Sequence, residues 1–190
     1  QNLLRGAAHG LFAGFDEFDP SLKCWAIPEE DTLDDFLSRA GFENIDAIDN
    51  LGWPCLMSAF LFASTPVVLE ILEKRPEMLY VRPMQGMSIL SVAVHRPLSD
   101  FKEIVFKNPR TSTLEELNHA SKRGYTPLDR AAKFGHHASV RCLLELGANS
   151  EVKRLDNGCT PLLSAADVGF PLCVKALLEF RADINARSFN

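Results

Sequence analysis

Two short stripes of apolar residues at helical spacing lie in the segment 122–152, and a glycine follows each of them. In order, the stripes consist of Leu128, Ala131 and Ala132 before Gly135, and Val140, Leu143 and Leu144 before Gly147. Thr126 and Pro127 supply a capping hydroxyl and a proline at the first helical position. The pattern predicts two short helices joined by a turn. Neither helix is long enough to be stable alone, so the unit must stack on similar units.

The same pattern returns along the chain. The frame G-x-T-P-L, A-A, G, V-x-x-L-L-x-x-x-A occurs from Gly124 and again from Gly158, at an offset of 34 residues. Weaker copies occupy residues 49–81 and residues 84 to about 109. The interval between the matched leucines of the weaker and stronger copies, Leu90 and Leu128, is 38 residues, which indicates an insertion at the polar turn 108–113.

This repeated frame resembles the ankyrin-repeat family, whose period is about 33 residues. The resemblance implies an all-α solenoid of stacked helix-turn-helix units with short β-turn fingers. Residues 29–48 resemble the second half of a degenerate repeat, and we expect them to form a short helix that ends at Gly41 and caps the stack. We therefore expect an N-terminal arm and connector (1–28), a capping half-repeat (29–48) and an ankyrin domain of about four repeats, two of them degenerate (49–190).

Composition narrows the class of protein. A formal net charge of −5 argues against nonspecific binding of nucleic acid, and no run reaches the length of a membrane span. The five cysteines form no CxxC pair, which favours free thiols in a reducing intracellular compartment. The chain begins at Gln1 rather than Met, so we expect a trimmed precursor or part of a longer protein. A cytoplasmic and an organellar location both stay open.

The N-terminal arm has two interpretations. Gly6, Gly10 and Gly14 are spaced by four, and phenylalanines recur beside acidic residues after them. The arm folds its phenylalanines onto its own first repeat, or it docks on a neighbouring protein or peripherally on a membrane.

No catalytic or metal-binding constellation is predicted. The sequence lacks a P-loop, a G-x-S-x-G elbow, a G-x-G-x-x-G loop and an H-E-x-x-H pair. His136, His137 and Cys142 are a weak metal candidate, because the family usually has a histidine at the position of His136, where it bonds to nearby backbone. We expect no enzyme activity and no cofactor.

The resemblance also implies where partners bind, because turn tips and the exposed side of each first helix line a concave surface in this family. The first repeat contributes an apolar set that marks a contact site or is covered by the arm: Trp53, Met57, Leu61 and Phe62. The later repeats contribute Met87, His95, Arg123, Tyr125, Arg130, Lys133, Phe134, Leu163 and Phe170. The cationic and aromatic members among these suit an acidic peptide or a lipid head group, or form a solvated face.

The predicted function is that of a protein–protein interaction scaffold, either an adaptor or a structural subunit of a larger assembly. The alternative is a targeting or regulatory module of a longer protein whose catalytic domain lies elsewhere. In both cases the expected partners are other proteins, with no nucleic acid.

Overall fold

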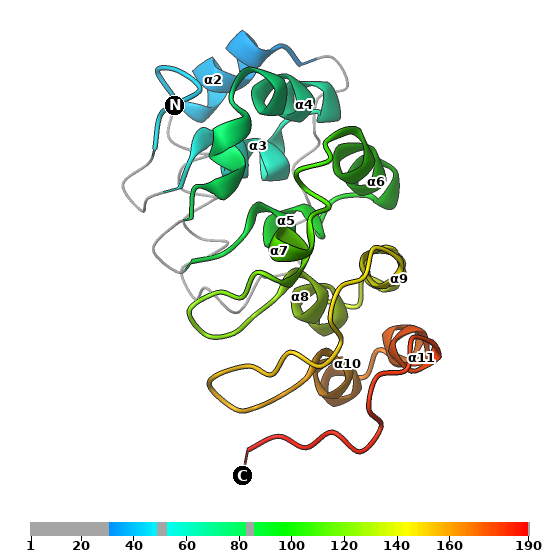
Figure 1. Ribbon diagram of the computed structural model, residues 1–190. Helices are drawn as coiled ribbons and strands as arrows, with labels where there is room; N and C mark the ends of the chain where they lie inside the picture. Colours follow the sequence, from blue (N-terminus) through cyan, green and yellow to red (C-terminus); the bar gives the residue numbers. More distant parts are fainter. Residues whose placement is uncertain (1–30, 49–52, 83–85, 190) are drawn as a thin grey trace. The chain divides into compact units, whose positions relative to one another are not determined.

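The computed structural model describes residues 31–48, 53–82 and 86–189 (Figure 1). These residues form short helices, and within them β-pairing is limited to an isolated bridge between Ile48 and Pro54. The all-α prediction is therefore confirmed. The chain divides into two compact units, residues 1–85 and 86–190. The predicted N-terminal arm (1–28) lies outside the described residues.

The described part of the first unit begins with the predicted capping helix. Its helices are α2 (Leu33–Ala40), α3 (Cys55–Phe62), α4 (Thr65–Lys74) and the 3-10 helix η1 (Pro76–Tyr80). The Thr32 hydroxyl accepts a hydrogen bond from the backbone N–H of Asp35 at 3.2 Å, and it donates one to the Asp35 carboxylate. Gly41, with φ of 72°, ends the helix in the left-handed region as predicted.

Helix α3 is apolar on every side. All eight of its residues are buried, and α2 and α4 both pack against it. A helix that is hydrophobic all round belongs to a core rather than to a surface. This burial contradicts an exposed apolar contact patch on the first repeat, which was one of the two alternatives for these residues.

The second unit consists of three helix pairs and one additional short helix. The first helices are α5 (Ile89–Ala93), α8 (Pro127–Lys133) and α10 (Pro161–Val168); the second helices are α6 (Leu98–Lys107), α9 (His137–Glu145) and α11 (Pro171–Glu179); the additional helix is α7 (Leu114–Asn118). Within this unit α8 packs between α5 and α10, and α9 packs against α6 and α11 (Figure 1). The predicted stack of helix-turn-helix units is thus confirmed for these residues.

Two details of the second unit differ from the sequence expectation. The sequence pattern predicts a second helix over 99–106 that Ser99 caps, but helix α6 begins at Leu98 after Pro97, and Ser99 does not cap it. The insertion after α6 forms the expected polar turn, but α7 follows it and packs against α8. Thr113 caps α7 by accepting a hydrogen bond from the backbone of Glu116 at 3.3 Å.

The loops that precede α8 and α10 project away from the second helices as fingers (Figure 1). The backbone N–H of Leu155 in the second finger donates to the carbonyl of Arg123 in the first, at 2.9 Å. Gly124 permits this approach, because a Cβ atom there would lie 2.7 Å from the backbone N of Leu155, and its φ is 88°. The fingers are therefore held together by main-chain contacts.

Candidate binding surface

Three consecutive loops of the second unit present their tips along one edge. They are the fingers 119–125 and 152–159 and the segment 185–189, which is tied to the second finger by a 2.7 Å hydrogen bond from Phe189 N to Asn157 O. We call six of the exposed side chains at these tips, the cations and the large apolar residues, the finger edge: Lys122, Arg123, Lys153, Leu155, Arg187 and Phe189. Leu155 is 71% exposed and Phe189 is 59% exposed. The finger edge thus combines cations with large apolar side chains.

Behind the finger edge, Tyr125 is enclosed by cations. The ring is only 4% exposed, with Lys133 Nζ 5.2 Å and Arg154 Cζ 4.9 Å from its centroid. Cations are attracted to the negative face of an aromatic ring. Tyr125 therefore supports the base of the finger and presents little surface to a partner.

Arg154 organises a buried polar network between two successive helix pairs, α8 with α9 and α10 with α11. It donates to the Tyr125 hydroxyl at 3.0 Å and to Ser164 Oγ at 2.7 Å. Its Nε lies 3.5 Å from the Asp129 carboxylate, which also accepts a 2.5 Å hydrogen bond from Ser164 Oγ. Burial raises the pKa of Asp129, and the opposing effects of Arg154 and Ser164 are smaller. The network is a structural junction, because its side chains come from two successive helix pairs and contact one another inside the stack.

A second buried cluster joins α5 to the α8 region. His95 Nδ1 lies 3.1 Å from His136 Nε2, and the Phe134 ring meets His95 edge-on at a centroid distance of 5.1 Å. Arg130, only 2% exposed, donates to the sulfur of Met87 at 3.3 Å. Burial lowers the pKa of this guanidinium to about 10. The side chain of His136 therefore reaches a histidine of the preceding pair, rather than the nearby backbone expected from the sequence.

Both histidines of this cluster are held in the neutral form. Burial, followed by the charges of Arg130 and His136, places the pKa of His95 well below its ordinary value, and burial also lowers the pKa of His136. In the unfolded chain the pKa of a histidine is about 6.5. As the pH falls through that value the unfolded state binds protons that the folded state refuses, so folding stability is lost.

We expect the free energy of unfolding to fall by at least about 1 kcal/mol between pH 7.5 and pH 5.5, because one histidine that stays neutral in the folded state accounts for roughly 1.4 kcal/mol over that whole interval. Urea unfolding at several pH values measures this dependence. A His95→Gln variant should flatten it, whereas His137→Gln, which changes an exposed histidine, should leave it intact. Equal slopes for the wild type and His95→Gln would contradict the assignment.

The predicted site residues fall into three groups by exposure. Trp53, Met57, Leu61 and Phe62 are buried in the first unit, and Met87, His95, Tyr125 and Arg130 are buried in the second. Lys133, Phe134, Leu163 and Phe170 are half-buried, and Arg123 is exposed. An exposed position was the wrong expectation for the buried eight, because their side chains pack inside their unit, and the charged or polar ones, Arg130 and His95, contact side chains of a neighbouring helix pair there.

Five of the six finger-edge residues were not predicted from the sequence: Lys122, Lys153, Leu155, Arg187 and Phe189. The predicted positions begin at the residue directly before each turn glycine, such as Arg123 before Gly124, so positions farther upstream and positions after the last repeat were left out. A signal was available in the frame itself: Leu155 lies three residues before Gly158 in an otherwise polar finger. An exposed leucine in such a turn is a better surface candidate than an apolar residue inside a helix.

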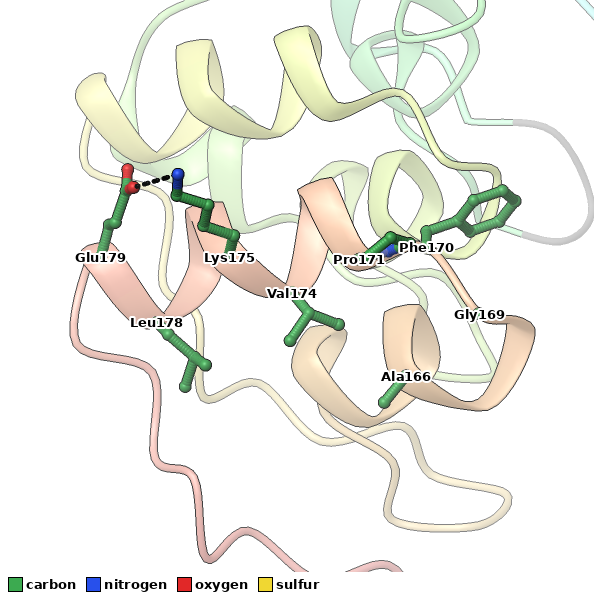
Figure 2. Close-up of a pocket in the computed structure, with 8 residues that line it drawn as sticks. All are labelled: Ala166, Gly169, Phe170, Pro171, Val174, Lys175, Leu178 and Glu179. Atoms are coloured by element: carbon green, nitrogen blue, oxygen red, sulfur yellow. Dashed lines mark ion pairs between the residues drawn. The ribbon is translucent and has the colours of Figure 1, made fainter.

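A second surface feature is an open groove of about 780 Å³ on the helix pair α10 and α11 (Figure 2). In Figure 2, Ala166, Val174 and Leu178 point away from the preceding helix pair, and Lys175 and Glu179 form a 4.0 Å ion pair at the rim. Phe170 points the other way, with its ring placed where a Cβ on Gly135 would lie at 2.6 Å. The groove is therefore an apolar end face of the described stack.

Two buried thiols that the structure describes are poor nucleophiles. Burial raises the pKa of the Cys55 thiol to about 12 and of the Cys173 thiol to about 11, so neither is a ready thiolate nucleophile. Within residues 31–48, 53–82 and 86–189, no group of three His, Cys, Asp or Glu side chains is placed to hold a metal ion. None of the helices in those ranges has the length and apolar character to cross a membrane.

Comparison with known proteins agrees with this architecture. A family model described as ankyrin repeats in three copies matches residues 90–188. The fold is similar to the crystal structure of the ankyrin repeat domain of Bcl-3, a unique member of the IkappaB protein family, with a TM-score of 0.64 and 24% sequence identity. That likeness covers 80% of this chain and 65% of the Bcl-3 chain, and at this identity it shows the fold alone. No curated protein sequence matches the chain.

The family match covers more than half of the chain, and it coincides with the helix pairs and fingers of the second unit. The repeated frame, the stacked pairs and the family match all identify the same units. The chain belongs to the ankyrin-repeat family.

Proposed function

We propose that this protein is a non-enzymatic scaffold, either an adaptor or a structural subunit of a larger assembly, and that its partner protein docks on the finger edge. Ankyrin repeats are in general protein–protein interaction modules. The observation that carries the proposal is the exposure of Leu155 and Phe189 at consecutive tips. Large apolar side chains exposed on neighbouring loops are typical of contact sites.

The fingers are suited to binding because they are already ordered. Main-chain hydrogen bonds of 2.9 Å and 2.7 Å link the three tips, and the Arg154 network anchors the second finger to the helices behind it. A partner therefore does not have to order these loops on binding, which lowers the entropic cost of association.

The perturbed titratable groups support a structural rather than a catalytic role. Asp129, His95 and Arg130 are all buried, and each contacts side chains of a neighbouring helix pair. Structural networks shift pKa values as active sites do, and here the shifted groups lie within the packing between repeats. The four described cysteines are free thiols, which supports a reducing compartment.

Replacing Leu155 by Ser is expected to release the partner while leaving the fold intact, because the side chain is 71% exposed. The measurement is co-purification of the tagged chain from its source cells with quantitative mass spectrometry. The matched control is Leu172→Ser, which changes a 59% exposed leucine on α11, away from the fingers. Equal retention of every stoichiometric partner by the Leu155→Ser variant and the wild type would count against the proposal.

A further inference from the structure

Charge is distributed unevenly along the chain. Residues 86–190 contain 14 Lys and Arg against 11 Asp and Glu, whereas residues 1–85 contain 6 against 14. Within the second unit, the finger edge contributes Lys122, Arg123, Lys153 and Arg187, and the three tip segments contain a single carboxylate, Asp156. The tips are thus locally basic in a protein that is acidic as a whole.

Three cations on the second helices, Lys107, Arg141 and Lys175, have carboxylate partners. Lys107 pairs with Glu103 at 2.7 Å on α6, and Lys175 and Arg141 both pair with Glu179 on α11. In contrast, the three cations Lys122, Lys153 and Arg187 form no ion pair with any residue that the structure describes. Their charge is therefore available to an incoming molecule.

Arg154 shows the difference between a structural and an available cation in the same finger. Its guanidinium is directed inward to Asp129 and Ser164, while the neighbouring Lys153 is exposed and donates only a long 3.4 Å hydrogen bond to the carbonyl of Arg187. The finger thus directs one of its two consecutive cations into the stack and the other to solvent.

We propose that the finger edge binds an acidic segment of the partner protein, in which Asp or Glu residues are interspersed with apolar ones. This inference rests on the proposed function and adds the chemistry of the ligand. The cations of the finger edge recognise the carboxylates of the segment. Leu155 and Phe189, each two residues after a cation of the finger edge, contact its apolar residues. Complementary charge of this kind steers association and selects among partners.

A protein segment fits these observations better than a nucleic acid or a membrane. The net charge of −5, with 14 carboxylates in residues 1–85, repels a polyphosphate or an anionic bilayer at long range. Nonspecific binding of single-stranded nucleic acid also uses successive exposed aromatic platforms, whereas Phe189 is the single exposed aromatic side chain of the finger edge and Tyr125 is covered by Lys133 and Arg154. A short acidic segment is small enough to interact mainly with the local positive charge of the tips.

The test uses a fluorescently labelled peptide rich in glutamate and leucine, and a second peptide in which lysine replaces each glutamate. The full chain is expected to bind the glutamate peptide selectively, with an affinity that falls as salt is added. Replacing Lys122 and Lys153 together by Glu should weaken binding by about tenfold. The pair Lys102→Glu and Arg110→Glu makes the same change in net charge at exposed sites away from the tips and should have no such effect.

Three outcomes overturn the acidic assignment: equal binding of the two peptides, equal losses in the two double variants, or tighter binding of a single-stranded oligonucleotide or phosphatidylserine vesicles than of the glutamate peptide. The proposed function is tested separately by Leu155→Ser. If that variant loses its partner in cells while the Lys122→Glu, Lys153→Glu variant keeps it, the finger edge binds a protein but not through acidic residues. If neither variant loses a partner, the proposed function fails as well.

Discussion

Replacing Arg154 by Ala is expected to lower the free energy of unfolding by about 3 to 5 kcal/mol, as for other buried ion pairs that lose one partner. The Asp129 side chain is 1% exposed, and it would keep its buried charge without the guanidinium that faces it. The same change removes the hydrogen bonds to Tyr125 and Ser164, which belong to successive helix pairs. The junction between these repeats should therefore weaken most.

Chemical denaturation of the purified variant measures this cost. The matched control is Arg141→Ala, which breaks an ion pair with Glu179 between the same two helix pairs, but one whose side chains are 47% and 40% exposed. An exposed pair contributes roughly 0 to 1 kcal/mol. An equal decrease in the free energy of unfolding for the two variants would show that the buried Arg154 network stabilises the fold no more than an exposed ion pair does.

The double variant Asp129→Ala, Arg154→Ala measures the interaction between these two side chains apart from their interactions with other residues. Removing both charges eliminates the uncompensated carboxylate, so the double variant should be less destabilised than the sum of the two single variants. Simple additivity would contradict a direct interaction between Asp129 and Arg154.

Replacing Leu144 by Ala is expected to cost about 2 to 5 kcal/mol, the range for a buried leucine that leaves a cavity. Leu144 is 6% exposed on α9, and α11 packs against that helix. The matched control is Leu178, which holds the same repeat position 34 residues later but is 37% exposed and lines the open groove on α11.

Leu178→Ala should therefore cost clearly less than Leu144→Ala, because fewer neighbouring atoms surround the side chain that is removed. Thermal or urea unfolding of both variants provides the comparison. A loss at Leu178 equal to that at Leu144 would contradict the exposed end face, and a negligible loss at Leu144 would mean that the repeat frame is misplaced.

The repeat architecture could be predicted because it depends on short-range patterns. The Thr-Pro starts, the apolar stripes such as Val140, Leu143 and Leu144, and the terminating glycines each act within one helix, and all are found in the structure. Helix α7 was missed because its five residues contain only two apolar side chains at helical spacing, Leu114 and Leu117, which are too few to indicate a helix. A helix this short is stabilised by its packing against α8 and by its Thr113 cap.

The binding surface was harder to predict because exposure depends on contacts between distant residues. Sequence alone cannot show that Arg154 points inward to Asp129 while Lys153 points to solvent, or that His95 meets His136 across 41 residues. The burial of Met57 and Leu61, in contrast, could have been inferred. In the segment CLMSAFLF, Ser58 is the only polar residue apart from the cysteine. The helix therefore has no polar face to turn toward water.

The central claim is that a partner protein contacts the finger edge. The most direct measurement is lysine-specific cross-linking of the native assembly, purified from source cells, followed by mass spectrometry. Lys122 and Lys153 report on the finger edge, and the exposed Lys102 and Lys107 on α6 serve as the reference. We predict cross-links from Lys122 and Lys153 to a stoichiometric partner. Partner cross-links confined to Lys102 and Lys107 would contradict the claim.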